Sequence, residues 1–192
     1  MTGKVRIGII GVGAIGSVHA NAYKGVPRAE VVALCDILPD RLRDKGARHG
    51  VETLYEDYRD LLANPEIDAV SVCVPNNVHR EIAVAALDAG KHVMLEKPMA
   101  LNQNEAMEIC AARDKAQKVL QMGMVCRQNP ESQALKDLVD RGDVGEIYHI
   151  RIVLARRRGI PGLGGWFTTK AESGGGPLID IGVHYFDLAM WL

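Results

Sequence analysis

Three side chains have types and positions suited to the oxidation of an alcohol. Lys97 lies in the sequence Glu-Lys-Pro at 96–98, directly after the predicted strand 92–95, and Asp180 and His184 lie four residues apart in a predicted helix. Residues four apart project from the same face of a helix. Oxidising a secondary alcohol needs a base for the hydroxyl proton, and histidine suits this task because its pKa lies near neutrality.

We predict one role for each of these side chains. His184 is the general base, Lys97 donates a hydrogen bond to the developing alkoxide, and Asp180 orients the substrate hydroxyls or supports the other two groups. The alternatives are an ordinary helix position for His184 and a solvated loop position for Lys97.

A glycine pattern near the N-terminus predicts a dinucleotide site. The apolar run 5–10 is typical of a buried strand and 14–23 of a helix, and Gly-x-Gly-x-x-Gly lies between them. In this context the first glycine permits a tight turn, the second lets the backbone approach a pyrophosphate, and the third allows the helix to pack on the strand. The helix N-terminus also presents N–H groups to the phosphates. The predicted contacts are Gly11, Gly13, Ala14, Ile15 and Gly16.

Asp36 follows the second predicted strand, 30–35, and indicates which dinucleotide binds. A carboxylate at this position can accept both adenosine ribose hydroxyls and would repel a 2′-phosphate, so we predict NAD, with NADP possible. Arg41 or Arg43 could still reach a 2′-phosphate. The alternative for Asp36 is a helix N-cap or turn residue.

Polar residues after two further predicted strands complete the predicted cofactor site. Ligands of doubly wound sheets bind at the carboxyl ends of the strands. Asn76 and His79 follow the predicted strand 69–74, and Glu96 and Lys97 follow the next one. Asn76 contacts a cofactor ribose or is only a turn residue. His79 is either a cofactor contact or a structural residue at the start of a helix.

Two residues are substrate candidates. Arg127 reaches the substrate or sits in a loop, and Trp166 stacks on the face of a sugar or anchors its own loop. The arginine run at 156–158 contacts an acidic or phosphorylated substrate, or it is a solvated strand end or a contact with a partner subunit. The remaining histidines lack the spacing of metal ligands, so we predict no metal site. They include His19, His49, His92 and His149.

A sheet must bring these residues together. Strand and helix patterns alternate through the first two-thirds of the chain, which predicts an α/β doubly wound parallel sheet (Rossmann) over residues 1–123. Beyond it, 130–141 and 177–192 are predicted helices, and 146–155 alternates like a strand of an open antiparallel sheet. A single strand with two helices cannot close a core, so we expect 124–192 to be the truncated, incomplete start of an α+β open-sheet domain.

Composition excludes several classes of function. The 192 residues are 47% hydrophobic and 24% charged, and the net charge is −1. These values are ordinary for a soluble globular protein and favour neither nucleic acid nor a membrane as partner. No stretch approaches the roughly 20 continuous apolar residues of a membrane span. The four cysteines lack Cys-x-x-Cys spacing, which favours a reducing compartment, and we predict a cytoplasmic location.

Taken together, the motifs resemble those of the glucose–fructose oxidoreductase/inositol dehydrogenase (Gfo/Idh/MocA) family of nicotinamide-dependent oxidoreductases. The resemblance covers essentially the whole chain. Its motifs are Gly-x-Gly-x-x-Gly at 11–16, Pro-Asn-Asn-x-His at 75–79, Glu-Lys-Pro at 96–98 and Asp-x-Gly-x-His at 180–184.

The resemblance implies where the substrate binds and what reaction follows. Lys97, Asp180 and His184 would line the substrate site beside the nicotinamide, and the Lys97–Pro98 peptide bond would be cis. The implied enzyme is an NAD(P)-dependent dehydrogenase or reductase that transfers hydride between the cofactor and a sugar, cyclitol or related polyol. The full-length protein would be a homo-oligomer. The alternatives are a non-catalytic NAD(H)-binding sensor or regulatory protein, and an inactive fragment of the same fold.

Overall fold

The computed structural model describes residues 3–155 and 165–192. The chain forms two compact units, residues 1–122 and residues 123–192. The arginine run at 156–158 lies outside the described residues. None of the helices in the described parts of the chain has the length and apolar character needed to cross a bilayer.

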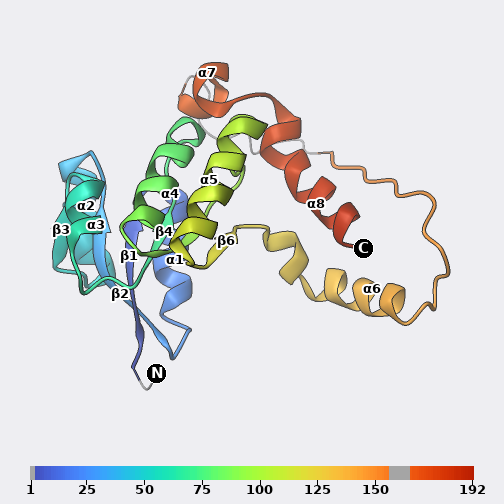
Figure 1. Cartoon of the computed structure of the whole chain (residues 1–192), viewed down its shortest axis with the longest axis horizontal. Helices are drawn as coiled ribbons and strands as arrows, with labels where there is room; N and C mark the ends of the chain where they lie inside the picture. The colour runs from blue at the N-terminus through green and yellow to red at the C-terminus, as the bar shows by residue number, and fades with distance from the viewer. Residues whose placement is uncertain (1–2, 156–164) are drawn as a thin grey trace. The chain divides into compact units, whose positions relative to one another are not determined.

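The first unit is built on a six-stranded parallel sheet with the order β3-β2-β1-β4-β5-β6 (Figure 1). The chain winds outward from β1 through β2 and β3, then returns to the other side of β1 and adds β4, β5 and β6. The predicted doubly wound sheet is therefore confirmed. The strands are β1 (Val5–Ile10), β2 (Ala29–Cys35), β3 (Thr53–Tyr55), β4 (Ala69–Val72), β5 (His92–Leu95) and β6 (Leu120–Met122).

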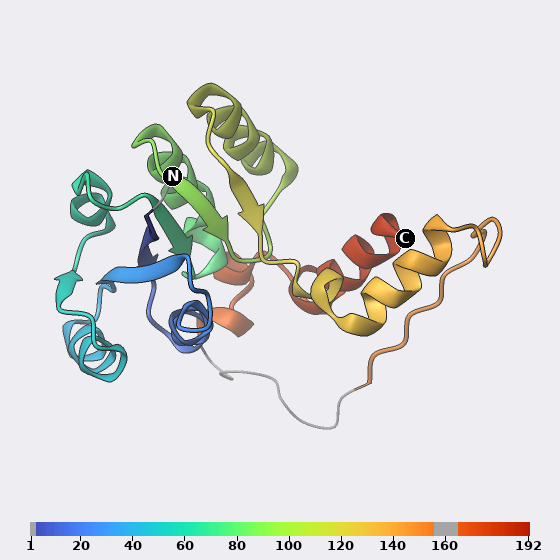
Figure 2. The ribbon, with the colours of Figure 1, turned by 90° about the horizontal axis from the view of Figure 1, so that it is seen from below.

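Helices cover both faces of this sheet. In Figure 2 the blue helices α1 and α2 lie below the strands, and the green helices α4 and α5 lie above them. The right-handed crossovers of a parallel sheet place helices on both faces when the winding direction reverses, as it does at β1. The helices are α1 (Ala14–Tyr23), α2 (Pro39–His49), α3 (Tyr58–Ala63), α4 (His79–Asp88) and α5 (Gln103–Ala116).

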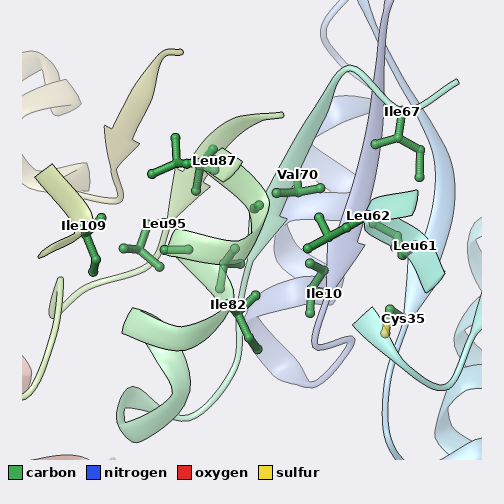
Figure 3. Close-up of a cluster of buried hydrophobic side chains, with 14 of the residues drawn as sticks. Ile10, Cys35, Leu61, Leu62, Ile67, Val70, Ile82, Leu87, Leu95 and Ile109 are labelled. Atoms are coloured by element: carbon green, nitrogen blue, oxygen red, sulfur yellow. The ribbon is translucent and has the colours of Figure 1, made fainter. Parts of the chain in front are cut away.

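The alternation of side chains along the strands builds one hydrophobic cluster on each face. In β1, Ile9 belongs to the cluster that includes α1 and α2, whereas Ile10 belongs to the cluster under α3, α4 and α5. Figure 3 shows part of the second cluster, with Val70 from the sheet and Ile82 and Ile109 from the covering helices. These two layers hold the strand ends, and the loops that follow them, in fixed positions.

The regular elements of the second unit, among its described residues, are all helical. It consists of η2 (Val125–Gln128), α6 (Pro130–Asp140), η3 (Trp166–Thr168), α7 (Lys170–Ser173), the π-helical segment η4 (Leu178–Gly182) and α8 (Val183–Trp191). The predicted strand at 146–155 is wrong for the structure described, since these residues form no regular structure. A strand needs a neighbour for its backbone hydrogen bonds, and no described residue of this unit supplies one.

Candidate active site

The glycine turn between β1 and α1 has two crowded positions and one open position. Gly11 has φ +85°, and a Cβ added there would overlap the carbonyl oxygen of Cys73. A Cβ on Gly16 would overlap the carbonyl oxygen of Gly11, whereas a Cβ on Gly13 would meet nothing within 4 Å. Two glycines are therefore required by the turn itself, while the third borders free space.

Helix α1 begins at this turn with its first N–H groups uncapped by any side chain. Gly13 is the N-cap residue and makes no side-chain hydrogen bond, and the first turn contains no acidic residue. The positive end of the helix dipole therefore faces the same region as Gly13. Such a terminus can receive a phosphate on Ala14 and Ile15.

Asp36 lies directly after β2 and braces the glycine turn. One carboxylate oxygen, Oδ2, accepts a hydrogen bond from the Val12 N–H at 3.0 Å, and Oδ1 accepts one from the Leu38 N–H at 3.0 Å. The guanidinium of Arg41 donates to Oδ2 at 3.3 Å, and Arg43 pairs instead with Asp40. Asp36 therefore has the turn role that the sequence analysis gave as its alternative. Its carboxylate also neutralises the charge of Arg41.

Glu96 holds the Glu-Lys-Pro segment that follows β5. Its Oε1 lies 2.9 Å from His19 Nε2, and its Oε2 accepts a hydrogen bond from the Lys97 N–H at 3.2 Å. Burial alone would raise the pKa of this carboxyl, but the hydrogen bond from His19 and the neighbouring charges outweigh it and lower the pKa. The Lys97–Pro98 peptide bond is cis, as predicted.

His79 fixes the other side of the same segment. The ring is 1% exposed, with Nδ1 2.7 Å from the Pro98 carbonyl oxygen and Nε2 3.0 Å from the Val74 carbonyl oxygen. Burial lowers the pKa of His79, while both hydrogen bonds oppose that shift. These contacts support the structural alternative for His79. Asn76 is also buried, in the 3₁₀ turn η1 (Asn76–Val78) after β4.

In the second unit, Asp180 and His184 lie on consecutive helical segments. Asp180 belongs to the π-helical turn η4, where its N–H bonds the Gly176 carbonyl, and His184 lies at the start of α8. The helix predicted over 177–192 therefore forms, but its first turn is wider than an α-turn. Single π-turns of this kind occur frequently at functional sites.

The two substrate candidates both have partners within the second unit. Arg127 forms a two-pronged ion pair with Asp187, with Nε donating to Oδ2 at 2.7 Å and Nη2 to Oδ1 at 2.5 Å. Its guanidinium also lies 5.7 Å from the Trp191 ring centroid. Trp166 packs edge-to-face on Phe167. These contacts give each residue a structural task, and their substrate roles stay predictions.

Two family models match the chain. The model described as "Oxidoreductase family, NAD-binding Rossmann fold" matches residues 5–124, and the GFO/IDH/MocA C-terminal domain matches residues 132–192. The chain belongs to the GFO/IDH/MocA oxidoreductase family.

Relatives within this family include sugar and inositol dehydrogenases. D-glucoside 3-dehydrogenase of Escherichia coli (strain K12) is 40% identical over 189 residues, covering 98% of this chain and 54% of the relative. Myo-inositol 2-dehydrogenase of Thermotoga maritima is 35% identical over 188 residues, with the same two coverages of 98% and 54%. A solved structure of levoglucosan dehydrogenase with NADH and levoglucosan has a TM-score of 0.88 at 27% identity, covering 98% of this chain and 54% of that one. The chain spans about half the length of the curated relatives it matches.

The GFO/IDH/MocA glycine turn of this chain fits a dinucleotide. The free space beside Gly13, the uncapped N-terminus of α1 and the carboxylate of Asp36 lie where a pyrophosphate and a ribose bind in this fold. Among residues 3–155 and 165–192, no group of three or more His, Cys, Asp or Glu side chains could hold a metal ion.

Sequence reasoning missed the part that His19 plays in this family member. The sequence pattern places His19 only among the histidines that lack metal-ligand spacing, yet its ring contacts Glu96, 77 residues away. Two signals could have revealed it. His19 and Tyr23 are four residues apart on α1, and Ser71 is a polar residue in the middle of an otherwise apolar strand. A buried hydroxyl in a core strand needs polar partners, and α1 supplies them.

Proposed function

We propose that the protein is a nicotinamide-dependent oxidoreductase that transfers hydride between NAD(P) and a sugar, cyclitol or related polyol. The observation that carries this proposal is the turn in which Gly11 and Gly16 are crowded while Gly13 borders open space at an uncapped helix N-terminus. Membership of the oxidoreductase family and the names of the relatives support the polyol substrate class.

NAD is the proposed cofactor, with NADP as the second choice. Asp36 offers a carboxylate for the adenosine ribose hydroxyls, and a 2′-phosphate would be repelled by it. Arg41, which could offset that repulsion, is paired with Asp36. The proposed cofactor contacts therefore include the glycine turn, Asp36, Asn76, Glu96 and Lys97.

The proposed chemistry assigns a proton and a hydrogen bond to residues of this chain. When bound, the nicotinamide accepts a hydride from the alcohol carbon. His184 takes the hydroxyl proton on an imidazole nitrogen, and Lys97 donates a hydrogen bond to the oxygen as its negative charge develops. Asp180 orients the substrate hydroxyls. Lys97 belongs to the first unit, and Asp180 and His184 belong to the second.

The domain organisation and cellular setting complete the proposal. Residues 1–123 form the dinucleotide-binding domain, and residues 124–192 belong to the substrate domain. The family models, which match 5–124 and 132–192, support this division. The full-length protein acts as a homo-oligomer in the cytoplasm on a small-molecule substrate.

Gly13→Ala tests the dinucleotide site without disturbing the fold. Gly13 has a negative φ of −65°, so it does not need the left-handed backbone that favours glycine, and the new methyl group meets no protein atom. It does occupy the space proposed for the pyrophosphate, so the Kd for NADH in a fluorescence titration should rise by about 10- to 100-fold with Tm unchanged. Gly25→Ala, at the far end of α1, is the matched control and should leave both values unchanged. Equal NADH affinity in wild type and Gly13→Ala would contradict the proposal.

Turnover tests the catalytic assignment. The full-length protein should reduce NAD with at least one member of a polyol panel, and His184→Ala should abolish that turnover while leaving the Kd for NADH unchanged. Wild-type rates in His184→Ala would refute the base assignment. Tight NADH binding with no turnover on any polyol would favour the sensor instead.

A further inference from the structure

A chain of polar side chains joins helix α1 to the Glu-Lys-Pro segment through the core of the first unit. Tyr23 Oη lies 2.7 Å from Ser71 Oγ, and Ser71 Oγ lies 3.3 Å from His19 Nδ1. The other ring nitrogen, Nε2, lies 2.9 Å from Glu96 Oε1. Ser71 is fully buried, and the side chains of His19 and Glu96 are 12% and 18% exposed. None of these contacts is used by the chemistry proposed above.

The donor in the contact between His19 and Glu96 follows from the charge of the carboxylate. The pKa of Glu96 is lowered, so near neutral pH its carboxylate only accepts, and the His19 Nε2–H must donate to it. The Ser71 hydroxyl lies between His19 Nδ1 and the Tyr23 phenol and is within hydrogen-bond distance of both. Burial raises the pKa of Tyr23, so the phenol is protonated near neutral pH. Every polar group is satisfied in this arrangement, which is what a buried network requires.

The carboxylate that His19 holds is also the one that fixes the backbone of Lys97. Glu96 Oε2 accepts from the Lys97 N–H, while the Glu96 N–H donates to the Val72 carbonyl of β4. On the far side of the lysine, His79 from α4 holds the Pro98 carbonyl. Lys97 therefore leaves the sheet between two anchored residues, one tied to α1 and the other to α4.

We propose that His19 is a positioning residue for Lys97, acting through the carboxylate of Glu96. The inference rests on the proposed function, in which Lys97 contacts the alcohol oxygen. Helix α1 begins at the glycine turn, where the pyrophosphate is proposed to bind, and it also carries His19. One helix therefore links the proposed pyrophosphate site to the backbone of Lys97. Loss of the His19–Glu96 contact lets the carboxylate rotate, and the lysine ammonium then moves relative to the substrate. Displacements of about 1 Å in such groups cost about 100-fold in rate.

Two substitutions of His19 separate positioning from simple packing. In His19→Gln the amide nitrogen replaces Nε2 and can still donate to Glu96, but nothing replaces Nδ1. In His19→Asn the shorter amide replaces Nδ1 and can still meet Ser71, but it does not reach Glu96. Both variants keep a polar side chain on the same face of α1. His92→Leu is the matched control, because His92 lies on β5 itself and its Nδ1 only accepts the Val119 N–H.

The variants are compared in the full-length protein by steady-state kinetics, NADH titration and the ¹⁵N–¹H resonance of the Lys97 amide. His19→Asn should lower kcat by about 10- to 100-fold, leave the Kd for NADH within about twofold, and shift the Lys97 amide resonance. His19→Gln should keep kcat within about threefold of wild type and leave that resonance in place. His92→Leu should match wild type in kcat and in the amide resonance.

Three outcomes would overturn the inference. They are equal kcat values in His19→Asn and wild type, equal losses in the Asn and Gln variants, and a Lys97 amide resonance that moves in neither variant. Failure of the proposed function is recognised separately, because wild type itself would then bind no NADH or turn over no polyol. The amide resonance reports the His19–Glu96–Lys97 connection in either case.

Discussion

The two units of this chain hold their secondary structure by different means. Among the described residues, every buried apolar side chain belongs to the first unit, where Leu34, Leu61 and Leu95 are completely inaccessible to solvent. In the second unit Tyr148 is 95% exposed and Val153 is 73% exposed. The contacts between its elements include the ion pair of Arg127 with Asp187, which joins η2 to α8. The first unit is therefore stabilised by burial of apolar area, and the second by local and polar contacts.

Equivalent leucine truncations should sharpen this comparison most. Leu95→Ala leaves a cavity between β5 and its covering helices and should cost about 2–5 kcal/mol of unfolding free energy. Leu135→Ala, in α6 with 42% exposure, should cost about 0.5 kcal/mol or less. Urea unfolding followed by circular dichroism measures both losses. Trp166 and Trp191 are the two tryptophans and both lie in the second unit, so fluorescence follows that unit alone.

The contrast between the two units is contradicted if the circular dichroism and fluorescence midpoints shift together. Leu95→Ala should lower the circular dichroism midpoint and leave the fluorescence midpoint in place. A common shift in both signals would mean that the two units unfold as one, and the separate descriptions of their stability would then fail.

A smaller effect is expected from the ion pair of the second unit. Arg127→Lys keeps the positive charge but loses the two-pronged contact with Asp187, and it should destabilise α8 by about 1 kcal/mol. Faster hydrogen exchange in α8 would report this loss, while KM for a polyol stays unchanged. A tenfold rise in KM with unchanged exchange would instead make Arg127 a substrate residue.

The smallest expected effect is the loss of stability of the first unit at acid pH. The Arg6 guanidinium lowers the pKa of Asp68 chiefly by hydrogen bonding, and the pKa of Glu96 is also lowered. A carboxyl with a lowered folded pKa stabilises the fold above its unfolded value and loses that contribution as pH falls. The unfolded values lie near 4, so Tm of the first unit should begin to fall below about pH 5. Asp68→Asn and Glu96→Gln should each flatten this slope, and an unchanged slope in both would contradict the assignment.

Sequence patterns predicted the fold wherever one segment contained its own signal. The apolar run 5–10, the glycines after it and the helix 14–23 form as predicted, because periodicity and backbone freedom are local properties. The segment 146–155 has an equally clear alternation and forms no strand. Alternation shows only that a segment could pair, and the pairing partner must come from elsewhere in a chain.

The candidate site was likewise predictable only where one segment carried the signal. The placement of Asp36 and Lys97 after their strands follows from strand order alone. The contact between His19 and Glu96 joins residues 77 positions apart, and that of His79 with Pro98 depends on the shape of a loop. Single-segment patterns carry no information about such pairs. His19 was therefore missed, and the partners of His79 could not be named from the sequence.

The brace between Asp36 and the amide of Val12 has a consequence for engineering cofactor preference. A redesign toward a phosphorylated ribose would first remove this carboxylate, and would thereby deprive the Val12 and Leu38 amides of their acceptor. The Val12 contact is buried, and a buried amide left without an acceptor costs about 1–3 kcal/mol. A successful redesign must therefore supply a new hydrogen-bond acceptor for the loop amides together with the positive charge that binds the phosphate. Cofactor specificity and loop structure then have to be changed together.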